Sequence, residues 1–143
     1  MLPCEKDDTD TVFAVKEAVR RGFNDFLLIG AVGGRLDHTL GNVSILLYLE
    51  SIGAKGMLLD DHSEMRIVSG NEEYIDDSWA YFSLLSISGQ ASGITISGAK
   101  YPLENGVIAP EYQYGISNEV LPGHTAKVTV GEGRLLLVKV DRE

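Results

Sequence analysis

Cysteine is almost absent from this sequence, because Cys4 is the only one among 143 residues. A single thiol cannot form a disulfide within the chain, which is typical of proteins from the reducing cytoplasm. One cysteine together with three scattered histidines also argues against a zinc site. We therefore predict a cytoplasmic protein that does not depend on disulfides or zinc.

Long apolar runs and an excess of basic residues are missing as well. No stretch approaches the length of about 20 residues that spans a bilayer, and residues 1–8 are too polar for a signal peptide. The chain has 12 basic residues against 21 acidic ones, a formal net charge of −9. Proteins that bind nucleic acid collect Lys and Arg to neutralise phosphates, so we expect neither nucleic-acid nor membrane binding.

Familiar nucleotide-binding and hydrolase signatures are also missing. Gly30, Gly33 and Gly34 do not have the G-x-G-x-x-G spacing, and no Gly-Lys-Ser/Thr follows them, which excludes a dinucleotide fingerprint and a P-loop. No serine has a G-x-S-x-G setting, so serine-hydrolase chemistry has no support. A nucleotide, if one is bound, must be held by another arrangement.

The most informative stretch that is present is Gly-Gly-Arg-Leu-Asp-His at residues 33–38, between an apolar run and a helical pattern. The first turn of a helix offers unpaired N–H groups and a partial positive charge, which suit an anion. Arg35 adds a planar fork that matches phosphate oxygens, and Asp37 adds an oxygen ligand for a divalent cation. On local grounds a simple turn, with Asp37 capping the next helix, explains the stretch equally well.

An acidic cluster near the N-terminus has two interpretations. Asp7, Asp8 and Asp10 precede a helical pattern, and acidic residues commonly stabilise the positive end of a helix. Taken alone, the cluster is best explained in this way. The functional interpretation is that Asp7 and Asp10 share a Mg²⁺ ion.

The first half of the chain alternates between helical and strand patterns. Valines at helical spacing over 12–19 predict one helix, and apolar residues stepping by three and four over 36–49 predict another. Short, continuously apolar runs at 26–29 and 57–59 indicate buried parallel strands. The order helix, strand, helix, strand predicts part of a doubly wound, Rossmann-like three-layer α/β domain, with fewer strands than such a sheet needs.

Beyond about residue 60 the pattern changes to short strands separated by turn residues. This predicts an antiparallel sandwich or barrel-like domain. The last two candidate strands flank residues 131–133 and predict a hairpin with a three-residue loop. The candidate strands are residues 65–68, 80–87, 93–96, 125–130 and 135–140.

Three stretches together resemble thiamine pyrophosphokinases of the bacterial type. They are Glu-Lys-Asp-x-Thr-Asp at 5–10, Gly-Gly-Arg-Leu-Asp-His at 33–38 with Gly-Asn at 41–42, and Gly-Ile-Ser-Asn at 115–118. Residues 82–84 and 98–103 agree with that family too. The resemblance implies a catalytic α/β domain over residues 1–70 and an all-β antiparallel sandwich that binds thiamine over 71–143. It also implies a homodimer whose active sites lie between the catalytic domain of one subunit and the sandwich of the other.

The family reaction transfers the diphosphoryl group of ATP to the hydroxyl of thiamine, giving thiamine diphosphate and AMP. The resemblance implies catalytic residues Asp10, Arg35 and Asp37, and Mg²⁺ carboxylates Asp7, Asp10 and Asp37. It implies phosphate binding by Lys6, Gly33, Gly34 and Arg35. Thiamine would contact Ser117, supported by Asn118.

The resemblance is incomplete at the N-terminus. Family members have further strands and an Asp-x-Asp-Ser motif before the stretch that corresponds to residues 5–10, and this sequence begins at Met1 without them. We therefore expect a chain that lacks the N-terminal part of the catalytic domain. The alternative to an active kinase is a truncated, non-catalytic thiamine-binding module or an inactive fragment.

Overall fold

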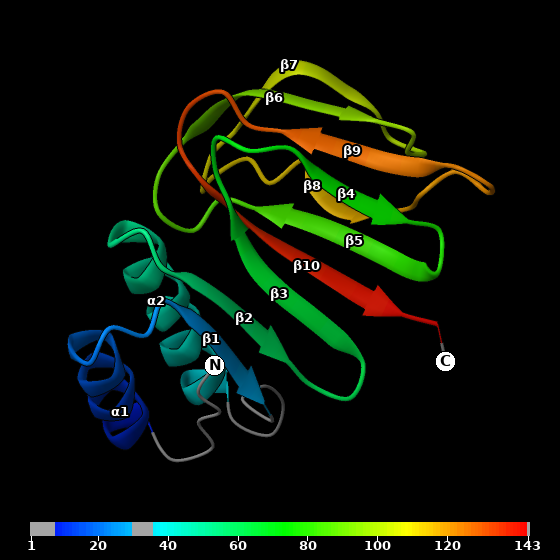
Figure 1. The fold of residues 1–143 in the computed structure, drawn as a ribbon. Coiled ribbons are helices and arrows are strands. Elements are labelled where there is room, and N and C mark those ends of the chain that lie inside the picture. Colours follow the sequence, from blue (N-terminus) through cyan, green and yellow to red (C-terminus); the bar gives the residue numbers. More distant parts are fainter. Residues whose placement is uncertain (1–7, 30–35, 143) are drawn as a thin grey trace. The chain divides into compact units, whose positions relative to one another are not determined.

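The computed structural model describes residues 8–29 and 36–142, and its elements are labelled in Figure 1. The chain divides into two compact units, Met1–Ile67 and Val68–Glu143. Each unit is built around its own set of strands, so the two are described in turn.

The first unit is a small α/β arrangement. Its elements are α1 (Asp8–Arg20), β1 (Asp25–Ile29), α2 (Leu36–Ser51), β2 (Lys55–Leu59) and β3 (Ser63–Val68), whose last residue begins the second unit. Strands β1 and β2 are parallel, and β3 runs antiparallel to β2. The predicted α/β half with two parallel buried strands is confirmed.

Apolar side chains explain why the helices pack as they do. Helix α2 packs against β2, and α1 packs against α2. Repeats of three and four residues place the buried side chains of each helix on one face. In the strands, Phe26 and Leu28 of β1 and Leu58 of β2 are buried. The buried apolar residues of this unit include Val15, Ala18, Phe26, Leu28, Ile45, Leu46, Leu49 and Leu58.

The turn between β2 and β3 is organised by Asp60. Its Oδ1 accepts hydrogen bonds from the N–H groups of His62 at 2.9 Å and Ser63 at 2.6 Å, and from Ser63 Oγ at 2.8 Å. Partial burial disfavours the carboxylate, but these hydrogen bonds outweigh it and hold the pKa of Asp60 below its ordinary value. The turn is therefore stabilised by an ionised side chain.

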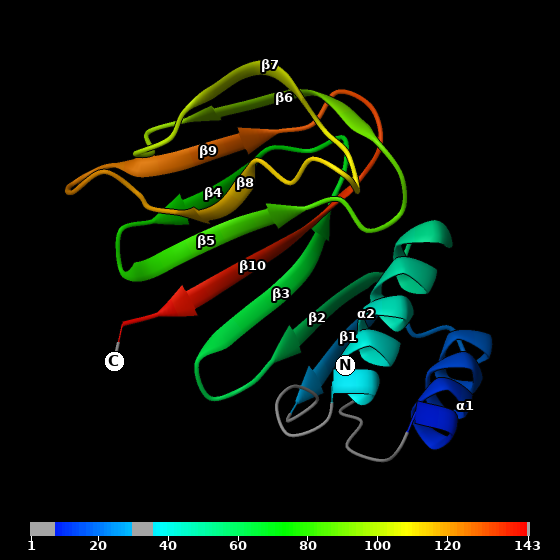
Figure 2. The same ribbon diagram turned by 180° about the vertical axis from the view of Figure 1, so that it is seen from behind.

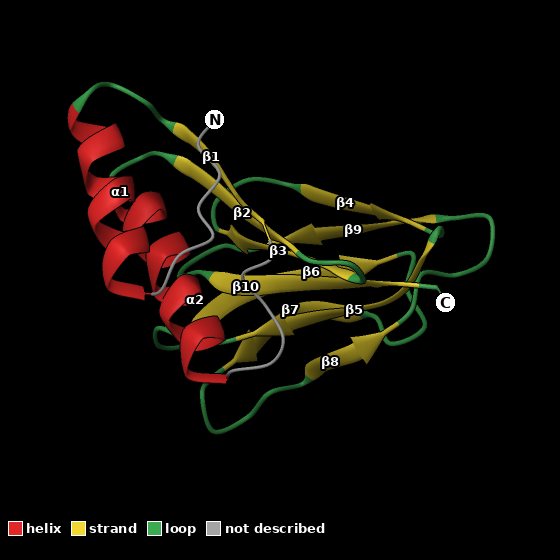
Figure 3. Cartoon of the chain, turned by 90° about the horizontal axis from the view of Figure 1, so that it is seen from below, coloured by secondary structure: helices red, strands yellow, loops and turns green. Residues whose placement is uncertain are grey.

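The second unit is a sandwich of two antiparallel sheets, seen from the two sides in Figures 1 and 2. One sheet has the order β10-β5-β8 and the other β4-β9-β6-β7. Figure 3 shows strands and loops throughout the described part of this unit, without a helix. The strands are β4 (Glu73–Asp76), β5 (Trp79–Leu85), β6 (Ala91–Ser97), β7 (Leu103–Ile108), β8 (Gly115–Asn118), β9 (Thr125–Thr129) and β10 (Leu135–Asp141).

A single apolar core lies between these two sheets. Both sheets contribute every second residue to it, as expected for strands with one buried face. The predicted antiparallel sandwich is therefore confirmed. Its core includes Ile75, Phe82, Leu84, Ile94, Ile96, Ile108, Ala126, Val128, Leu135 and Leu137.

The predicted hairpin between the last two strands is wrong. Strand β9 pairs with β4 and β6, whereas β10 pairs with β5 in the other sheet. The loop between them pairs with Ser92 instead, whose N–H donates to the Glu132 carbonyl at 2.9 Å and whose carbonyl accepts from the Glu132 N–H at 3.0 Å. The chain crosses between sheets because both strands bury their apolar rows from opposite sides of one core, through Ala126, Val128, Leu135 and Leu137.

No helix among residues 8–29 and 36–142 is long and apolar enough to cross a membrane.

Candidate functional site

Two of the residues predicted for phosphate and metal binding, Asp10 and Asp37, lie at the starts of the two helices. Helices α1 and α2 begin at the same end of the first unit, the end toward which β1 and β2 point in Figure 1. In α/β sheets this edge, beyond the carboxyl ends of the strands, is where ligands bind. Five of the predicted residues lie outside the described residues, namely Lys6, Asp7, Gly33, Gly34 and Arg35.

Asp10 and Asp37 occupy equivalent places on their helices. Asp10 lies in the first turn of α1, and Asp37 is the second residue of α2. The Asp37 side chain is exposed, and its Oδ1 accepts a hydrogen bond from the His38 N–H at 2.9 Å. A carboxylate in the first turn is stabilised by the positive end of the helix. Asp37 therefore combines a role in starting α2 with a solvent-exposed side chain.

The chemistry of the predicted metal ligands fits a hard divalent cation. Asp7, Asp10 and Asp37 offer carboxylate oxygens, the ligands that Mg²⁺ prefers. Within the part of the chain that the structure describes, no group of three or more His, Cys, Asp or Glu side chains is placed to hold a metal by itself.

The predicted thiamine-contacting pair lies on β8, an edge strand of the sandwich. Ser117 is exposed and has φ 57°, in the left-handed region that side-chain-bearing residues rarely adopt. Asn118 is 2% exposed and points inward. The two neighbours therefore have different tasks, since only Ser117 presents its side chain to solvent.

Asn118 holds the backbone of the Tyr101 segment. Its Oδ1 accepts hydrogen bonds from the Tyr101 N–H at 3.0 Å and the Glu119 N–H at 2.9 Å, and its Nδ2 donates to the Tyr101 carbonyl at 2.8 Å. A buried amide whose two ends are both hydrogen-bonded is hard to replace, because any partner left behind would be unsatisfied. The structure makes Asn118 a clamp between β8 and residues 99–103.

Close backbone approach around these residues requires glycine at two positions. A Cβ on Gly115 would lie 2.7 Å from the Leu84 carbonyl oxygen. At Gly98, with φ +72°, a Cβ would lie 2.5 Å from the Thr125 carbonyl oxygen. Neither contact is tolerable for a side chain, so both glycines belong to the construction of this edge.

An exposed ion pair lies beside the clamp. Lys100 Nζ is 3.3 Å from Glu119 Oε2, and this contact raises the pKa of the Lys100 ammonium. The same ammonium lies 5.4 Å from the centroid of the Tyr101 ring. Such exposed pairs contribute little to stability, but this one balances the charge next to β8.

Sequence reasoning missed one residue of this region. Ser83 on β5 accepts a hydrogen bond from the Ser117 N–H, with Oγ and N 2.9 Å apart. Residues 82–84 contributed to the family resemblance, but that resemblance assigned Ser83 no role. The contact depends on strand register between residues 34 positions apart, which no local pattern in the sequence reveals.

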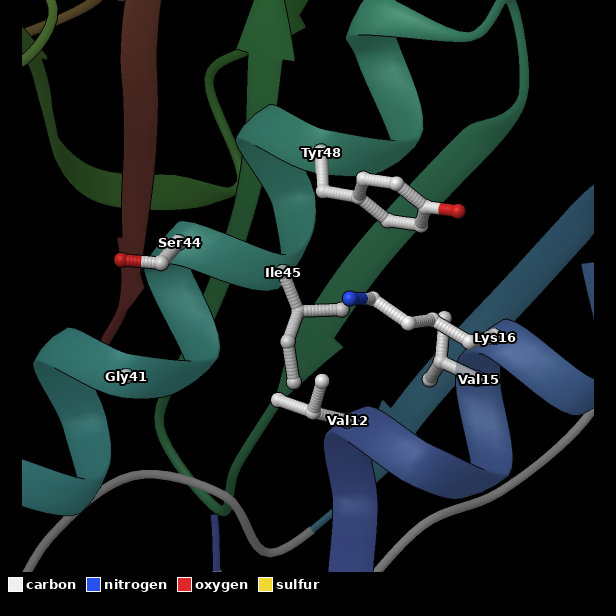
Figure 4. Close-up of a pocket in the computed structure, with 7 residues that line it drawn as sticks. All are labelled: Val12, Val15, Lys16, Gly41, Ser44, Ile45 and Tyr48. Carbon is white, nitrogen blue, oxygen red and sulfur yellow. The ribbon is translucent and has the colours of Figure 1, made fainter. Parts of the chain in front are cut away.

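A cavity of about 220 Å³ lies between the two helices of the first unit. Figure 4 shows its walls, mostly apolar side chains with the Lys16 side chain extending toward Tyr48, and Lys16 Nζ lies 5.7 Å from the Tyr48 ring centroid. None of the predicted site residues is among the described residues that line it. The lining consists of Val12, Val15, Lys16, Gly41, Ser44, Ile45 and Tyr48.

Both halves of the chain match models of one protein family. Residues 1–57 match the model described as thiamin pyrophosphokinase, catalytic domain, and residues 70–135 match thiamin pyrophosphokinase, vitamin B1 binding domain. The first match falls in the α/β unit, and the second falls in the sandwich. The two models therefore follow the same order as the two units.

Known proteins agree with these matches. Thiamine pyrophosphokinase of Bacillus subtilis (strain 168) is 29% identical over 137 residues, which cover 94% of this chain and 64% of that protein. A crystal structure of thiamine pyrophosphokinase from Bacillus subtilis superposes with a TM-score of 0.84 at 27% identity, covering 98% of this chain and 66% of that one. The crystal structure of thiamin pyrophosphokinase from Geobacillus thermodenitrificans has a TM-score of 0.79 at 30% identity, covering 99% of this chain and 65% of that one.

A more distant likeness extends the agreement in fold. The crystal structure of yeast thiamin pyrophosphokinase has a TM-score of 0.70 at 15% identity, over 95% of this chain and 51% of that one. This chain thus spans less than two thirds of the length of the Bacillus subtilis protein. Both domain models match in the expected order, and the relatives align with nearly all of this sequence. The chain therefore belongs to the thiamin pyrophosphokinase family.

Proposed function

We propose that this protein transfers the diphosphoryl group of ATP to the hydroxyl of thiamine, giving thiamine diphosphate and AMP. The observation that carries the proposal is the ordered match of both halves to the catalytic and vitamin B1 binding models of one kinase family. We assign residues 1–70 to the catalytic domain and 71–143 to the thiamine-binding domain. In this reaction the thiamine hydroxyl oxygen bonds to the β-phosphorus of ATP. The bond from that phosphorus to the bridging oxygen of AMP breaks, and the hydroxyl proton is released.

The residues at the helix starts would serve the phosphate side of the reaction. Phosphoryl transfer requires mostly positioning of the reactants and neutralisation of phosphate charge. The Arg35 guanidinium would bind the transferred phosphates in a bidentate manner, which an ammonium cannot reproduce. Lys6 would add a positive charge, and the backbone of Gly33 and Gly34 would allow phosphate oxygens to approach closely. Support comes from α1 and α2, which begin at the same end of their unit.

Carboxylates at the same end would hold Mg²⁺. Asp10 and Asp37 would be its ligands, with Asp7 as a third, because all three supply hard oxygen donors. When bound, the ion would neutralise the negative charge of the phosphates as the new bond forms.

Thiamine would bind at β8. We propose that the Ser117 hydroxyl meets the aminopyrimidine of thiamine and that Asn118 supports it. The exposed side chain of Ser117 and the buried, fully engaged side chain of Asn118 support this division of roles. We further propose a cytoplasmic homodimer, with each active site shared between the catalytic domain of one subunit and the sandwich of the other.

The test measures AMP released from Mg·ATP by the full-length gene product, with and without thiamine. Thiamine monophosphate, which lacks the free hydroxyl, is the control substrate. AMP that forms with thiamine but not with its monophosphate supports the proposal. AMP at the same rate with both compounds contradicts it.

A second candidate function is thiamine binding without transfer. It is favoured by the vitamin B1 binding model, which matches residues 70–135 within a compact unit of their own. Calorimetric titration of the chain with thiamine, in parallel with the AMP assay, separates the two candidates. Binding heat without any AMP supports the second, and binding heat with AMP supports the first.

A further inference from the structure

The strand that carries Ser117 is not a regular β-strand. Asn118 lies opposite Phe82 and Gly115 lies opposite Leu84, so that Ile116 and Ser117 together face the single residue Ser83. Two residues opposite one define a β-bulge, which bends the strand and redirects a side chain. The left-handed φ of 57° at Ser117 belongs to this bulge.

A side-chain oxygen accepts the hydrogen bond that the interrupted ladder leaves unmade. A bulge leaves a backbone N–H without its regular partner on the neighbouring strand. Here the Ser117 N–H donates to Ser83 Oγ at 2.9 Å, in place of a carbonyl. Ser83 is half-buried on the central strand β5, which holds its hydroxyl in place.

The other side of Ser117 is held by Asn118. Its three hydrogen bonds to the Tyr101 and Glu119 backbone fix the residue that follows Ser117. Ser117 thus sits between two anchored positions, in a backbone conformation that costs energy for a non-glycine residue. Such strain persists where the surroundings determine the conformation, and it marks functional positions more often than others.

We infer that Ser83 and Asn118 are positioning residues, which hold the bulge at Ser117 so that its hydroxyl is presented to thiamine in a fixed direction. This inference rests on the proposed thiamine site at Ser117. Neither residue needs to touch thiamine. Ser83 acts through the Ser117 N–H, and Asn118 acts through the clamp on Tyr101. Prior ordering of the binding group lowers the entropy cost of association.

The test uses Ser83→Ala, which removes the acceptor, and Ser83→Thr, which restores a hydroxyl on a residue that suits strands. Ser97→Ala is the matched control, because Ser97 is an exposed serine on β6 in the other sheet. Thiamine affinity is measured by calorimetry, the melting temperature by circular dichroism, and amide exchange at Ser117 by NMR.

We expect Ser83→Ala to weaken thiamine binding about tenfold and to speed amide exchange at Ser117 by a similar factor. Ser83→Thr should restore both values to within about twofold of wild type, and Ser97→Ala should change neither. A purely structural role for Ser83 would lower the melting temperature without a selective loss of thiamine affinity.

Ser117→Ala separates this inference from the function on which it rests. If Ser117→Ala weakens thiamine binding but Ser83→Ala does not, the positioning role is refuted and the thiamine site stands. If neither variant weakens binding, the thiamine site at Ser117 is itself wrong, and the positioning role falls with it.

Discussion

Replacing Ser117 with glycine should stabilise the fold and weaken thiamine binding at the same time. Ser117 has φ 57°, and the left-handed region costs an L-residue about 1–2 kcal/mol. Glycine loses more backbone freedom on folding, which offsets about 0.5–1 kcal/mol of this gain. The net stabilisation is therefore about 0–1.5 kcal/mol, and for a chain near this length we expect the melting temperature to rise by up to about 6 °C.

The binding loss has a separate cause. The hydrogen bond from residue 117 to Ser83 uses the backbone N–H, so glycine keeps it. Only the hydroxyl proposed to meet thiamine disappears. One lost hydrogen bond to a ligand typically corresponds to about 1 kcal/mol, so we expect thiamine affinity to fall about fivefold to tenfold.

Two further variants separate the effect of the strained backbone at Ser117 from the effect of its hydroxyl. Ser117→Ala removes the hydroxyl but keeps the strained backbone, so it should lose affinity without any gain in melting temperature. Asn105→Gly is the matched control, because Asn105 is the other described non-glycine residue with positive φ, at 49°, and asparagine tolerates this region. It should change the melting temperature less and leave thiamine affinity unchanged. A lower melting temperature for Ser117→Gly would contradict the strain at this residue, and unchanged thiamine affinity would contradict a contact between its hydroxyl and thiamine.

Four further predictions concern other parts of the chain. Asp37→Asn should abolish AMP formation with almost no change in melting temperature, because the amide keeps an acceptor for the helix N-terminus; activity close to wild type would reduce Asp37 to a cap. Arg35→Lys should lower turnover in the same assay, since an ammonium lacks the bidentate fork, and wild-type turnover would count against phosphate binding there. Gly98→Ala should destabilise the chain by about 2 kcal/mol or more in urea unfolding, because its Cβ would lie 2.5 Å from the Thr125 carbonyl oxygen at a φ of +72°. A smaller loss would mean that the backbone can shift there. The pKa of Asp60 is lowered in the folded chain, so its ionised form stabilises the fold above the ordinary carboxyl pKa, and this contribution is lost as the pH falls through the lowered value. Asp60→Asn should therefore flatten the dependence of unfolding free energy on pH below about 5, and an unchanged slope would contradict this origin.

The first unit was largely predictable because its signals are local. Continuous apolar runs identified β1 and β2 as buried parallel strands, and repeats of three and four residues identified both helices. Gly22 and Gly53 follow α1 and α2 with φ of 96° and 78°, the left-handed conformation in which glycine commonly ends a helix. Each of these features depends on residues within one turn or one strand, so the sequence was sufficient.

The sandwich was predictable as a class but not in its connections. Strands β4, β7 and β8 escaped detection because β4 and β8 have only four residues each, and because β7 and β8 contain glycine. The crossing from β9 to β10 was mistaken for a hairpin, because alternation along a strand shows which side chains face inward but not which strand lies alongside. Pairing over long separations in sequence decides both features.

The candidate site was likewise predictable only in part. Ser117 and Asn118 were predicted as site residues from a short motif, because their types and order are visible in the sequence. The bulge opposite Ser83 and the clamp on Tyr101 could not be predicted, since both depend on the register between β8 and its neighbours.

The identity of the products is the most direct test of the proposed reaction. Phosphorus NMR of the full-length gene product with Mg·ATP and thiamine follows every phosphate as the reaction proceeds. We expect AMP and thiamine diphosphate in equal amounts, because the β- and γ-phosphates move together in the proposed reaction. ADP with thiamine monophosphate, or AMP that forms without thiamine diphosphate, would contradict it.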